Sequence, residues 1–382
     1  MTTLSTTSEQ ARAGLVRSMS DSGVLSSPGW ADAFRSVPRE AFVPRFQLRS
    51  RGGDRLDTYT EQHPGFHEAV YQDTSLITRW DDGGTAVSSS SEPSLMARML
   101  EAFDVTGTDR VLEVGTGTGY NTALLCHRLG ADQVVSVDID PELTAAARQS
   151  LAAVGHAPDL VTGDGTLGLA ARAPYGGILA TCGVRRIPAD WLRQVRPGGV
   201  IVTNIGTGIT VLRVDGDGAA AGRFLPDPAA FMIARSTPAQ VHHRAGPYAG
   251  LVMNGIGRVT REDLSDVRDT DGFYLDLMEG SALEIALIQH DVLSVVLTVE
   301  ETDVYGLVHP DTGSWVRIKP LGRATAEITA GGPRDLWNER VTLTTRWVEA
   351  GRPGPAAYTL TVDADGMHTL WREEPASTSW QL

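Results

Sequence analysis

The chain of 382 residues is long for one compact domain, so two domains are expected. Its composition, with 41% hydrophobic and 21% charged residues, is ordinary for a globular protein. The formal net charge of −14 argues against DNA or RNA as a partner, because binding phosphates requires a basic surface.

The alternation of strands and helices begins only at residue 85. Residues 8–35 are predicted to be helical, and "SVPREAFVP" (36–44) to form a turn. Residues 46–84 are rich in Gly, Asp and aromatic residues, which is typical of an irregular covering loop.

Strands then alternate with helices, which predicts an α/β fold with a doubly wound parallel sheet. The expected strands are 110–114, 133–140, 159–165, 175–181 and 198–206, and the helices are 120–130, 141–155 and 188–195.

The end of this pattern suggests a domain boundary. A hairpin (210–225) and a closing strand (230–236) are expected to complete a first domain, 1–237. Residues 238–382 are predicted to form an α+β accessory domain. Its expected elements are strands at 294–301 and 313–320, a helix at 333–351 and a hairpin at 358–371 with an Asp-Gly turn.

The stretch "VLEVGTGTGY" (111–120) predicts a strand, a glycine loop and a helix. Glycines let a backbone approach a ligand and adopt positive φ without a side-chain clash. A dinucleotide-binding fingerprint would place its third glycine at position 120, where this chain has Tyr120. A tight structural turn without a ligand is the alternative interpretation.

Acidic residues lie near the ends of three successive strands. Asp138 is placed to accept hydrogen bonds from ribose hydroxyls, and Asp164 to lie beside an adenine. Glu113 precedes the glycine loop, and its carboxylate either orders the loop or meets a cationic end of the ligand. Each acid alone is compatible with a solvated strand end. Together they suit a zwitterionic nucleoside without phosphates, which is S-adenosylmethionine.

Several motifs in order resemble the S-adenosylmethionine-dependent methyltransferases, and more narrowly the protein L-isoaspartyl O-methyltransferase family. These are "VPREAFVP", "SSSEPSLMARML", "VLEVGTGTGYNTALL", "VVSVDID", "GDG" and "RPGGVIVTNIG", within residues 15–236. The resemblance implies a Rossmann-like class I methyltransferase sheet. It also implies a cofactor site at Glu113, Gly115, Thr116, Gly117, Asp138, Ile139, Asp164 and Gly165.

The serine run at 88–91 matches the family's Thr-Ile-Ser-x-Pro segment. Ser89 takes the threonine position, Ser91 the serine and Pro93 the proline, while Ser90 replaces an apolar residue. A carboxylate acceptor, with a pKa of about 4, is already ionised near pH 7 and needs positioning rather than a base. Ser91 is therefore the candidate for orienting that carboxylate, and Ser89 for lining the transfer site. Helix capping before Pro93 is the alternative role.

The extended form of the chain, with "TSLIT" and "GGPRDLW…RWVEAGRPG", resembles homologues from actinobacterial ribosomal-peptide pathways. Those enzymes act on graspetides, lanthipeptides, lasso peptides or imiditides. The resemblance implies methylation of an Asp side chain in a peptide, followed by closure to an aspartimide that persists or opens to isoaspartate. The alternatives are a general repair enzyme for isoaspartate, a cofactor-binding scaffold without activity, and a small-molecule methyltransferase.

Residues 260–303 are strongly acidic, which is compatible with a cationic or macrocyclised precursor peptide as partner or with a solvated surface. The acids are Glu262, Asp263, Asp266, Asp269, Asp271, Asp276, Glu279, Glu284, Asp291, Glu300, Glu301 and Asp303. Four tryptophans, of which two or more are expected in the core, are the other candidates for a peptide groove: Trp315, Trp337, Trp347 and Trp371.

The remaining sequence features are expected absences. No apolar run is long enough to cross a membrane, and the polar N-terminus does not resemble a secretory signal. Cys126 and Cys182 are the only cysteines and are typical of a reducing compartment, so a cytoplasmic location is predicted. The nine histidines show no HExxH or HxxxH spacing, and no metal site is expected.

Overall fold

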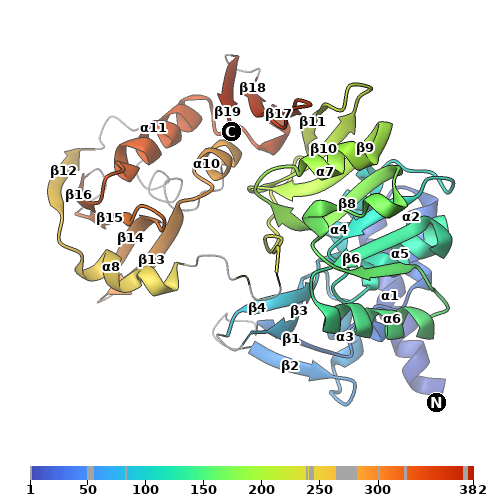
Figure 1. Cartoon of the computed structure of the whole chain (residues 1–382). Coiled ribbons are helices and arrows are strands. Elements are labelled where there is room, and N and C mark those ends of the chain that lie inside the picture. Colours follow the sequence, from blue (N-terminus) through green and yellow to red (C-terminus); the bar gives the residue numbers. More distant parts are fainter. Residues whose placement is uncertain are drawn as a thin grey trace.

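A ten-stranded mixed sheet forms the centre of the computed structural model (Figure 1). The structure describes residues 2–49, 56–81, 84–237, 240, 245–263, 282–299, 302–321, 325–372 and 377–382. The strand order is β19-β18-β17-β11-β10-β9-β8-β5-β6-β7. The parallel strands are β5 (Val111–Val114), β6 (Val134–Asp138), β7 (Asp159–Thr162), β8 (Tyr175–Val184) and β9 (Val195–Ile205).

Helices cover both faces of this parallel part, as the near-continuous apolar character of its strands requires. Val111 and Leu179 face one cluster of buried side chains, whereas Leu112 and Ile178 face the other. The helices on the first face are α2 (Pro28–Ser36), α4 (Pro93–Ala102), α5 (Tyr120–Leu129) and α6 (Pro141–Ala153). On the second face lie α7 (Ala189–Gln194) and α10 (Leu283–Ile288). The predicted doubly wound α/β fold is confirmed.

The N-terminal part differs from the prediction in two respects. The single helix expected at 8–35 is two helices, α1 (Thr2–Asp21) and α2, because Gly23 adopts a φ of 75° and Pro28 starts a new helix. The covering loop expected at 46–84 is wrong, since short alternating segments there pair into a four-stranded antiparallel sheet, β2-β1-β3-β4. Its elements are β1 (Arg45–Arg49), β2 (Leu56–Thr60), α3 (Phe66–Val70), β3 (Leu76–Trp80) and β4 (Ala86–Ser90).

The hairpin expected at 210–225 is confirmed as β10 (Gly208–Val214) and β11 (Ala220–Phe224). The closing strand expected at 230–236 is wrong. That segment forms only an isolated bridge between Ile233 and Gly183, in which Gly183 N–H donates to the Met232 carbonyl and Ala234 N–H to the Gly183 carbonyl, each at 2.8 Å.

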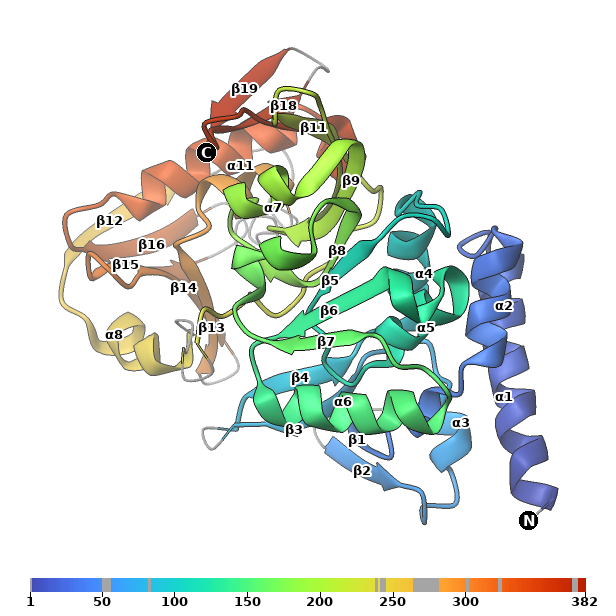
Figure 2. The same cartoon turned by 45° about the vertical axis from the view of Figure 1, so that its right-hand side comes forward.

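A second, five-stranded antiparallel sheet has the order β12-β16-β15-β14-β13 (Figures 1 and 2). Leu336 and Trp337 of α11 pack against one face, and Val252 of α8 packs against the other. The elements are α8 (Ala249–Asn254), β12 (Arg258–Asp263), β13 (Leu293–Val299), β14 (Thr302–His309), β15 (Ser314–Pro320), β16 (Thr325–Gly331) and α11 (Leu336–Glu349).

The two sheets are connected by elements that belong to both cores. Leu283 and Leu287 of α10 pack in the core of the large sheet, while Ile285 of the same helix packs against α11. The C-terminal strands β17 (Tyr358–Val362), β18 (His368–Arg372) and β19 (Thr378–Gln381) extend the large sheet from β11. We propose the division at 237/238 and call residues 1–237 the first unit and residues 238–382 the second unit, with α10 and β17–β19 of the second unit lying on the large sheet.

Buried ion pairing strengthens this connection. Glu284 on α10 is fully buried, and its Oε2 accepts hydrogen bonds at 2.8 Å from Arg372 Nη1 and Tyr358 Oη. Removing one partner of such a pair leaves an uncompensated buried charge, so the contact fixes α10 firmly on the large sheet.

Candidate functional site

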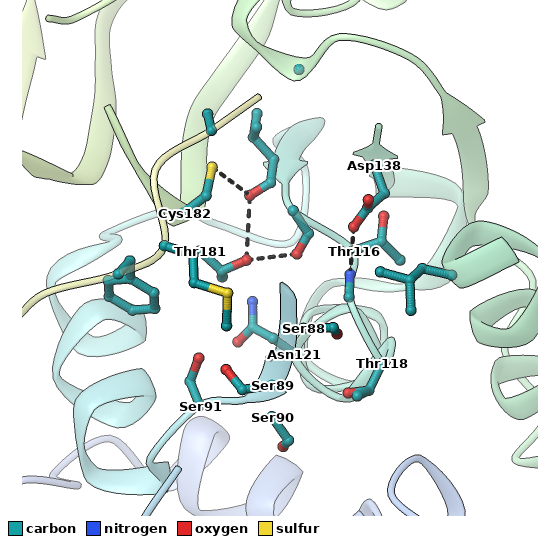
Figure 3. A pocket seen from close by; sticks show the side chains of 18 of the residues that line it. Ser88, Ser89, Ser90, Ser91, Thr116, Thr118, Asn121, Asp138, Thr181 and Cys182 are labelled. Atoms are coloured by element: carbon teal, nitrogen blue, oxygen red, sulfur yellow. Dashed lines mark hydrogen bonds between the residues drawn. The ribbon is translucent and has the colours of Figure 1, made fainter. Parts of the chain in front are cut away.

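A cavity of about 240 Å³ lies at the carboxyl ends of β5 and β6 (Figure 3). In the sheet, β6 and β7 lie on one side of β5, whereas β8 and β9 lie on its other side. The strand order therefore reverses at β5, and open α/β sheets bind ligands at such a point. The described lining comes mainly from β4 and the start of α4, the loop after β5 and the start of α5, the ends of β6 and β8, Gly165 and the segment 230–235.

The glycine loop has the backbone that the sequence predicts. Gly115 and Gly117 adopt φ values of 95° and 52°, which side chains other than glycine rarely tolerate. A Cβ added to Gly115 would approach Thr181 Oγ1 to 2.8 Å, and this hydroxyl donates a 2.6 Å hydrogen bond to the Gly115 carbonyl. The loop is thus held open toward the cavity by its own conformation and by β8.

Glu113 lies beneath the loop and is fully buried. Its carboxylate accepts hydrogen bonds from Asn121 Nδ2 at 2.7 Å, from Ser136 Oγ at 2.6 Å and from the Thr122 hydroxyl. Burial raises the pKa of Glu113 to about 7 despite these donors. Of the two roles that the sequence left open, this geometry favours ordering the loop.

Asp138 lies at the cavity at the end of β6, next to Ile139. Its Oδ2 accepts from the Gly117 backbone N–H at 2.8 Å, and its Oδ1 accepts from the Asp140 N–H at 3.0 Å. Burial raises the pKa of this carboxyl, although both backbone donors oppose the change. Thr116 also lines the cavity, and its hydroxyl is bonded to Ser136 Oγ at 2.6 Å. The carboxylate keeps acceptor capacity for ligand hydroxyls.

Asp164 and Gly165 follow β7, and the structure places them differently. Asp164 caps a short turn by accepting from Thr166 N–H and Oγ1, and it is not among the residues that line the cavity. Gly165 does line it, and an added Cβ there would approach Val114 Cγ1 to 2.4 Å. Only glycine fits at this wall.

The four serines divide by face, because successive side chains of a strand point to opposite sides. Ser88 and Ser90 are buried: Ser88 Oγ bonds Thr78 Oγ1 at 3.1 Å, and Ser90 Oγ accepts from Arg39 Nε at 3.2 Å. Figure 3 shows Ser89 and Ser91 turned toward the cavity and Ser90 turned away from it. In the part of the chain that the structure describes, the Ser89 and Ser91 hydroxyls have no protein partner.

Arg39 holds this strand from behind, and sequence reasoning missed it. The side chain is fully buried, and its Nη2 donates to the Ser90 and Ser91 carbonyls at 3.2 and 2.9 Å. Its other donors reach the carbonyls of Val70, Gln72 and Thr74. Burial lowers the pKa of Arg39 to about 10. The only available signal was its place inside "VPREAFVP", the motif quoted for the family.

The capping alternative for Ser91 is wrong. Helix α4 begins at Pro93 with Glu92 as its N-cap residue, and no side-chain cap bond forms there. Asp73 takes that role from the preceding loop, since its carboxylate accepts from both the N–H and the hydroxyl of Ser94. The Ser91 side chain is therefore not occupied by the helix end.

Titratable groups are few around the cavity. Among the described lining residues they are Tyr120, Asp138, Cys182 and Arg235. Burial raises the pKa of Cys182 to about 12 and also raises that of Tyr120, so both stay neutral near pH 7. Among its described residues the lining thus offers hydroxyls for positioning and no histidine, lysine or glutamate, and its one carboxylate, Asp138, accepts from the Gly117 and Asp140 N–H groups. Such a lining suits an acceptor that is already an anion and needs no general base.

The acidic stretch and the tryptophans that the sequence singled out provide less support for a binding site. Glu284 and Asp291, from the acidic stretch, are paired with arginines, and Trp315, Trp337 and Trp347 are buried, whereas Trp371 is exposed. Seven of the acids lie outside the described residues: Asp266, Asp269, Asp271, Asp276, Glu279, Glu300 and Glu301. In the described ranges no group of three metal-ligating side chains forms, and no helix there has the length and apolarity to span a membrane.

Comparisons with known proteins agree with this geometry. The family model described as Protein-L-isoaspartate(D-aspartate) O-methyltransferase (PCMT) matches residues 54–218. Protein-L-isoaspartate O-methyltransferase 2 of Pelobacter propionicus is 36% identical over 183 residues, which are 48% of this chain and 69% of that protein. The enzyme of Ignicoccus hospitalis is 33% identical over 196 residues, 51% and 81% of the two chains. This chain belongs to the protein-L-isoaspartate O-methyltransferase family.

The methyltransferase family predicted from the motifs is thus confirmed, and the chain is an S-adenosylmethionine-dependent protein carboxyl O-methyltransferase. A solved protein-L-isoaspartate O-methyltransferase has a similar fold, with a TM-score of 0.53 at 23% identity. The match covers 95% of this chain and 99% of the other. The similarity of fold therefore reaches beyond the methyltransferase sheet into the second unit.

Proposed function

We propose that this methyltransferase esterifies the side-chain carboxylate of an aspartate in a ribosomally made peptide. The observation that supports carboxylate chemistry is a pair of hydroxyls, Ser89 and Ser91, that have no hydrogen-bond partner among the described residues and lie on the same cavity as the glycine loop. Ser91 orients the acceptor carboxylate by donating a hydrogen bond, and Ser89 lines the path of the methyl group. Hydroxyls hold an anion without neutralising it as a lysine would, which keeps the oxygen nucleophilic.

The proposed cofactor site is the other wall of the cavity. Asp138 would accept hydrogen bonds from the ribose hydroxyls of S-adenosylmethionine, Ile139 and Gly165 would line the adenine end, and the Gly115–Gly117 backbone with Thr116 would line the remaining polar part. Asp164 and Glu113 act indirectly, since the Asp164 carboxylate holds the turn after β7 and the Glu113 carboxylate holds the start of α5, which follows the glycine loop. S-adenosylmethionine supplies an electrophilic methyl group when it is bound.

The transfer needs little from the protein besides alignment. A carboxylate oxygen of the peptide forms the new C–O bond while the S–C bond of the methyl sulfonium breaks, and no proton moves. The backbone nitrogen of the next peptide residue then attacks the ester carbonyl, loses its proton and expels methanol. The resulting aspartimide persists or takes up water to give isoaspartate.

The second unit is the feature that supports a chosen peptide as substrate. It is fixed beside the methyltransferase sheet because Leu283 and Leu287 of α10 pack in the core of the large sheet and β17 pairs with β11, so it presents a constant surface next to the cavity. Attraction of a cationic or macrocyclised precursor would depend on the acids that lie outside the described residues.

General repair of isoaspartyl proteins is the alternative, and one observation favours it. The solved enzyme with that name matches 95% of this chain, so an enlarged chain alone does not separate the two functions.

The distinguishing experiment compares two sets of acceptors with the purified enzyme and labelled S-adenosylmethionine. One set is isoaspartyl test peptides of varied sequence, and the other is aspartate-containing peptides encoded next to the gene. The proposal expects one encoded peptide to gain a methyl group and then lose methanol by mass spectrometry. Efficient turnover of many unrelated isoaspartyl peptides, with none of the encoded ones modified, would establish repair instead.

A further inference from the structure

A second cavity, of about 510 Å³, lies between the two units. One wall comes mainly from the end of β8 and the two arginines after it, with Ile233, Ala234, Ser236 and Gln240, and the other from the second sheet and its loops. The second-sheet wall consists of Asp291, Leu293, Pro310 and Asp311. Ile233 and Ala234 line this cavity and the cofactor cavity as well, so the two spaces adjoin along that segment. We call the second space the inter-unit cleft.

Strand β8 leads from one space to the other. Thr181 and Cys182 line the cofactor cavity, and Val184, Arg185 and Arg186 line the cleft. A strand advances about 3.3 Å per residue, so Arg186 lies at most about 13 Å along the chain from Cys182. An extended peptide covers that distance in about four residues, and the reach of an arginine side chain widens this to about two to five.

The β8 wall of the cleft is cationic although the chain as a whole is acidic. Arg185 and Arg186 are both exposed. Arg185 Nη1 donates to the His290 carbonyl at 2.9 Å and so ties this wall to the second unit. The Arg186 guanidinium forms no hydrogen bond or ion pair with the described residues and faces the cleft.

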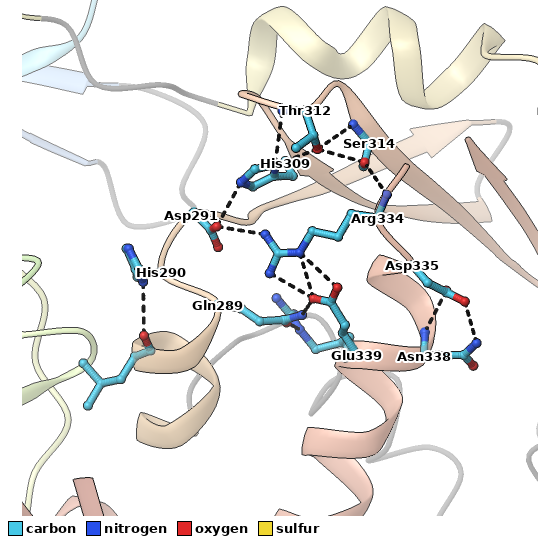
Figure 4. A network of polar contacts seen from close by, with 12 residues as sticks. Gln289, His290, Asp291, His309, Thr312, Ser314, Arg334, Asp335, Asn338 and Glu339 are labelled. Carbon is cyan, nitrogen blue, oxygen red and sulfur yellow. Dashed lines mark hydrogen bonds and ion pairs between the residues drawn. The ribbon is translucent and has the colours of Figure 1, made fainter. Parts of the chain in front are cut away.

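The two acids on the opposite wall, Asp291 and Asp311, both interact with other groups of the protein. The Oδ2 of Asp291 is bonded to Arg334 Nη1 at 2.8 Å and to His309 Nε2 at 2.9 Å, as Figure 4 shows. Burial would raise the pKa of Asp291, but the hydrogen bond and charge of Arg334 outweigh burial and lower it. This carboxylate is therefore ionised and already paired, while Arg186 keeps its charge for a ligand.

We propose that the inter-unit cleft binds the flank of the peptide substrate and that Arg186 pairs there with a carboxylate of the peptide. This carboxylate lies about two to five residues from the acceptor aspartate in an extended chain. The inference rests on the proposed peptide methylation. It adds a requirement that the cofactor cavity does not impose, namely an acidic residue at a fixed distance from the acceptor.

The test measures binding separately from turnover. Labelled nonapeptides carry a central aspartate or isoaspartate, neutral residues elsewhere, and one Glu three positions before or after the acceptor; matched peptides carry Gln instead. Fluorescence anisotropy with enzyme saturated in S-adenosylhomocysteine gives each Kd at low salt. Wild-type enzyme should bind one Glu peptide about fivefold more tightly than its Gln match, an advantage that added salt reduces.

Arg186→Gln should remove this advantage, Arg186→Lys should restore part of it, and Arg223→Gln, an exposed arginine on β11, should leave it intact. Equal Kd values for Glu and Gln peptides in the wild type, or absence of binding, would overturn the cleft, as would an advantage that survives Arg186→Gln. Methyl transfer to the same peptides distinguishes the failures. Charge-dependent binding without methylation of aspartate refutes the proposed function alone, and methylation without charge dependence refutes the cleft alone.

Discussion

Polar side chains around the cofactor cavity are of two kinds: some are buried and hydrogen-bonded to the protein, and others face the cavity without a partner among the described residues. We infer that the first kind stabilises the fold and that the second kind is available to a ligand. Behind β4 and under the glycine loop, Arg39, Ser90 and Glu113 are buried and bonded to protein groups. On the cavity side, Ser89 and Ser91 have the same chemistry as Ser90 but no partner in the described part of the chain. A buried polar group without a partner is costly, so hydroxyls left unbonded at a cavity are available to a ligand.

The largest effect on stability should come from Arg39, one of the buried side chains that are hydrogen-bonded to the protein. Arg39→Met removes donors to five carbonyls and leaves them buried, so the free energy of unfolding should fall by about 3–5 kcal/mol. Urea unfolding measures this change, with Arg223→Gln as an exposed control that should lie within about 0.5 kcal/mol of wild type. Unchanged stability of Arg39→Met would show that β4 does not depend on this side chain.

Glu113 predicts a pH dependence of stability. Its pKa of about 7 in the folded state exceeds the ordinary 4.5, so between these values the folded chain binds more protons than the unfolded chain. Stability therefore falls as pH rises from about 4.5 to 7, by about 3 kcal/mol from this group. Glu113→Gln should remove that slope in denaturation series at pH 5 and 7.5. The same slope in both proteins would assign it to other groups.

Ser91→Ala tests the hydroxyls that face the cavity without a partner among the described residues. Because the Ser91 hydroxyl has no partner among the residues that the structure describes, its loss should leave the free energy of unfolding within about 0.5 kcal/mol of wild type, while kcat/KM falls about 100-fold through lost alignment of the acceptor. Calorimetry should give nearly unchanged affinity for S-adenosylmethionine. A loss of stability that parallels the loss of activity would move Ser91 into the structural set.

Ser90→Ala should have the smallest effect of these variants, and in contrast to Ser91→Ala it should lower stability and leave turnover nearly unchanged. The change removes the hydroxyl that accepts from Arg39 Nε but keeps the hydrogen bonds of Arg39 to the backbone carbonyls. The free energy of unfolding should therefore fall by about 1 kcal/mol. At temperatures where the variant is folded, its kcat/KM should stay within about threefold of wild type. A large fall in turnover of the folded variant would erase the distinction between the two faces.

The sequence predicts the parts of this site that lie within one short segment better than the parts that bring distant segments together. The glycine loop and Asp138 are adjacent to their own strands, so strand, loop and acid could be placed from one short segment. Ser89 and Ser91 were found through the family motif, but their separation from Ser88 and Ser90 depends on β4 being a strand. That required recognising β1–β3, whose short segments were mistaken for a loop.

Long-range contacts were beyond the sequence pattern. Arg39 lies 51 residues before Ser90, and Asp73 caps a helix that begins 20 residues later; neither spacing has a local periodicity. The place of α10 in two cores has the same cause, since Leu283 and Ile285 read only as a short apolar run until their partners are known.

The most direct test of the account is a double-mutant cycle on the acceptor carboxylate. Kd is measured for the methyl-accepting peptide and for its Asn counterpart, with wild-type and Ser91→Ala enzyme saturated in S-adenosylhomocysteine. The account predicts that wild type prefers the carboxylate about tenfold and that Ser91→Ala loses most of this preference, a coupling of about 1–1.5 kcal/mol. Equal weakening for both peptides, with the preference intact, would contradict the claim that Ser91 holds the carboxylate.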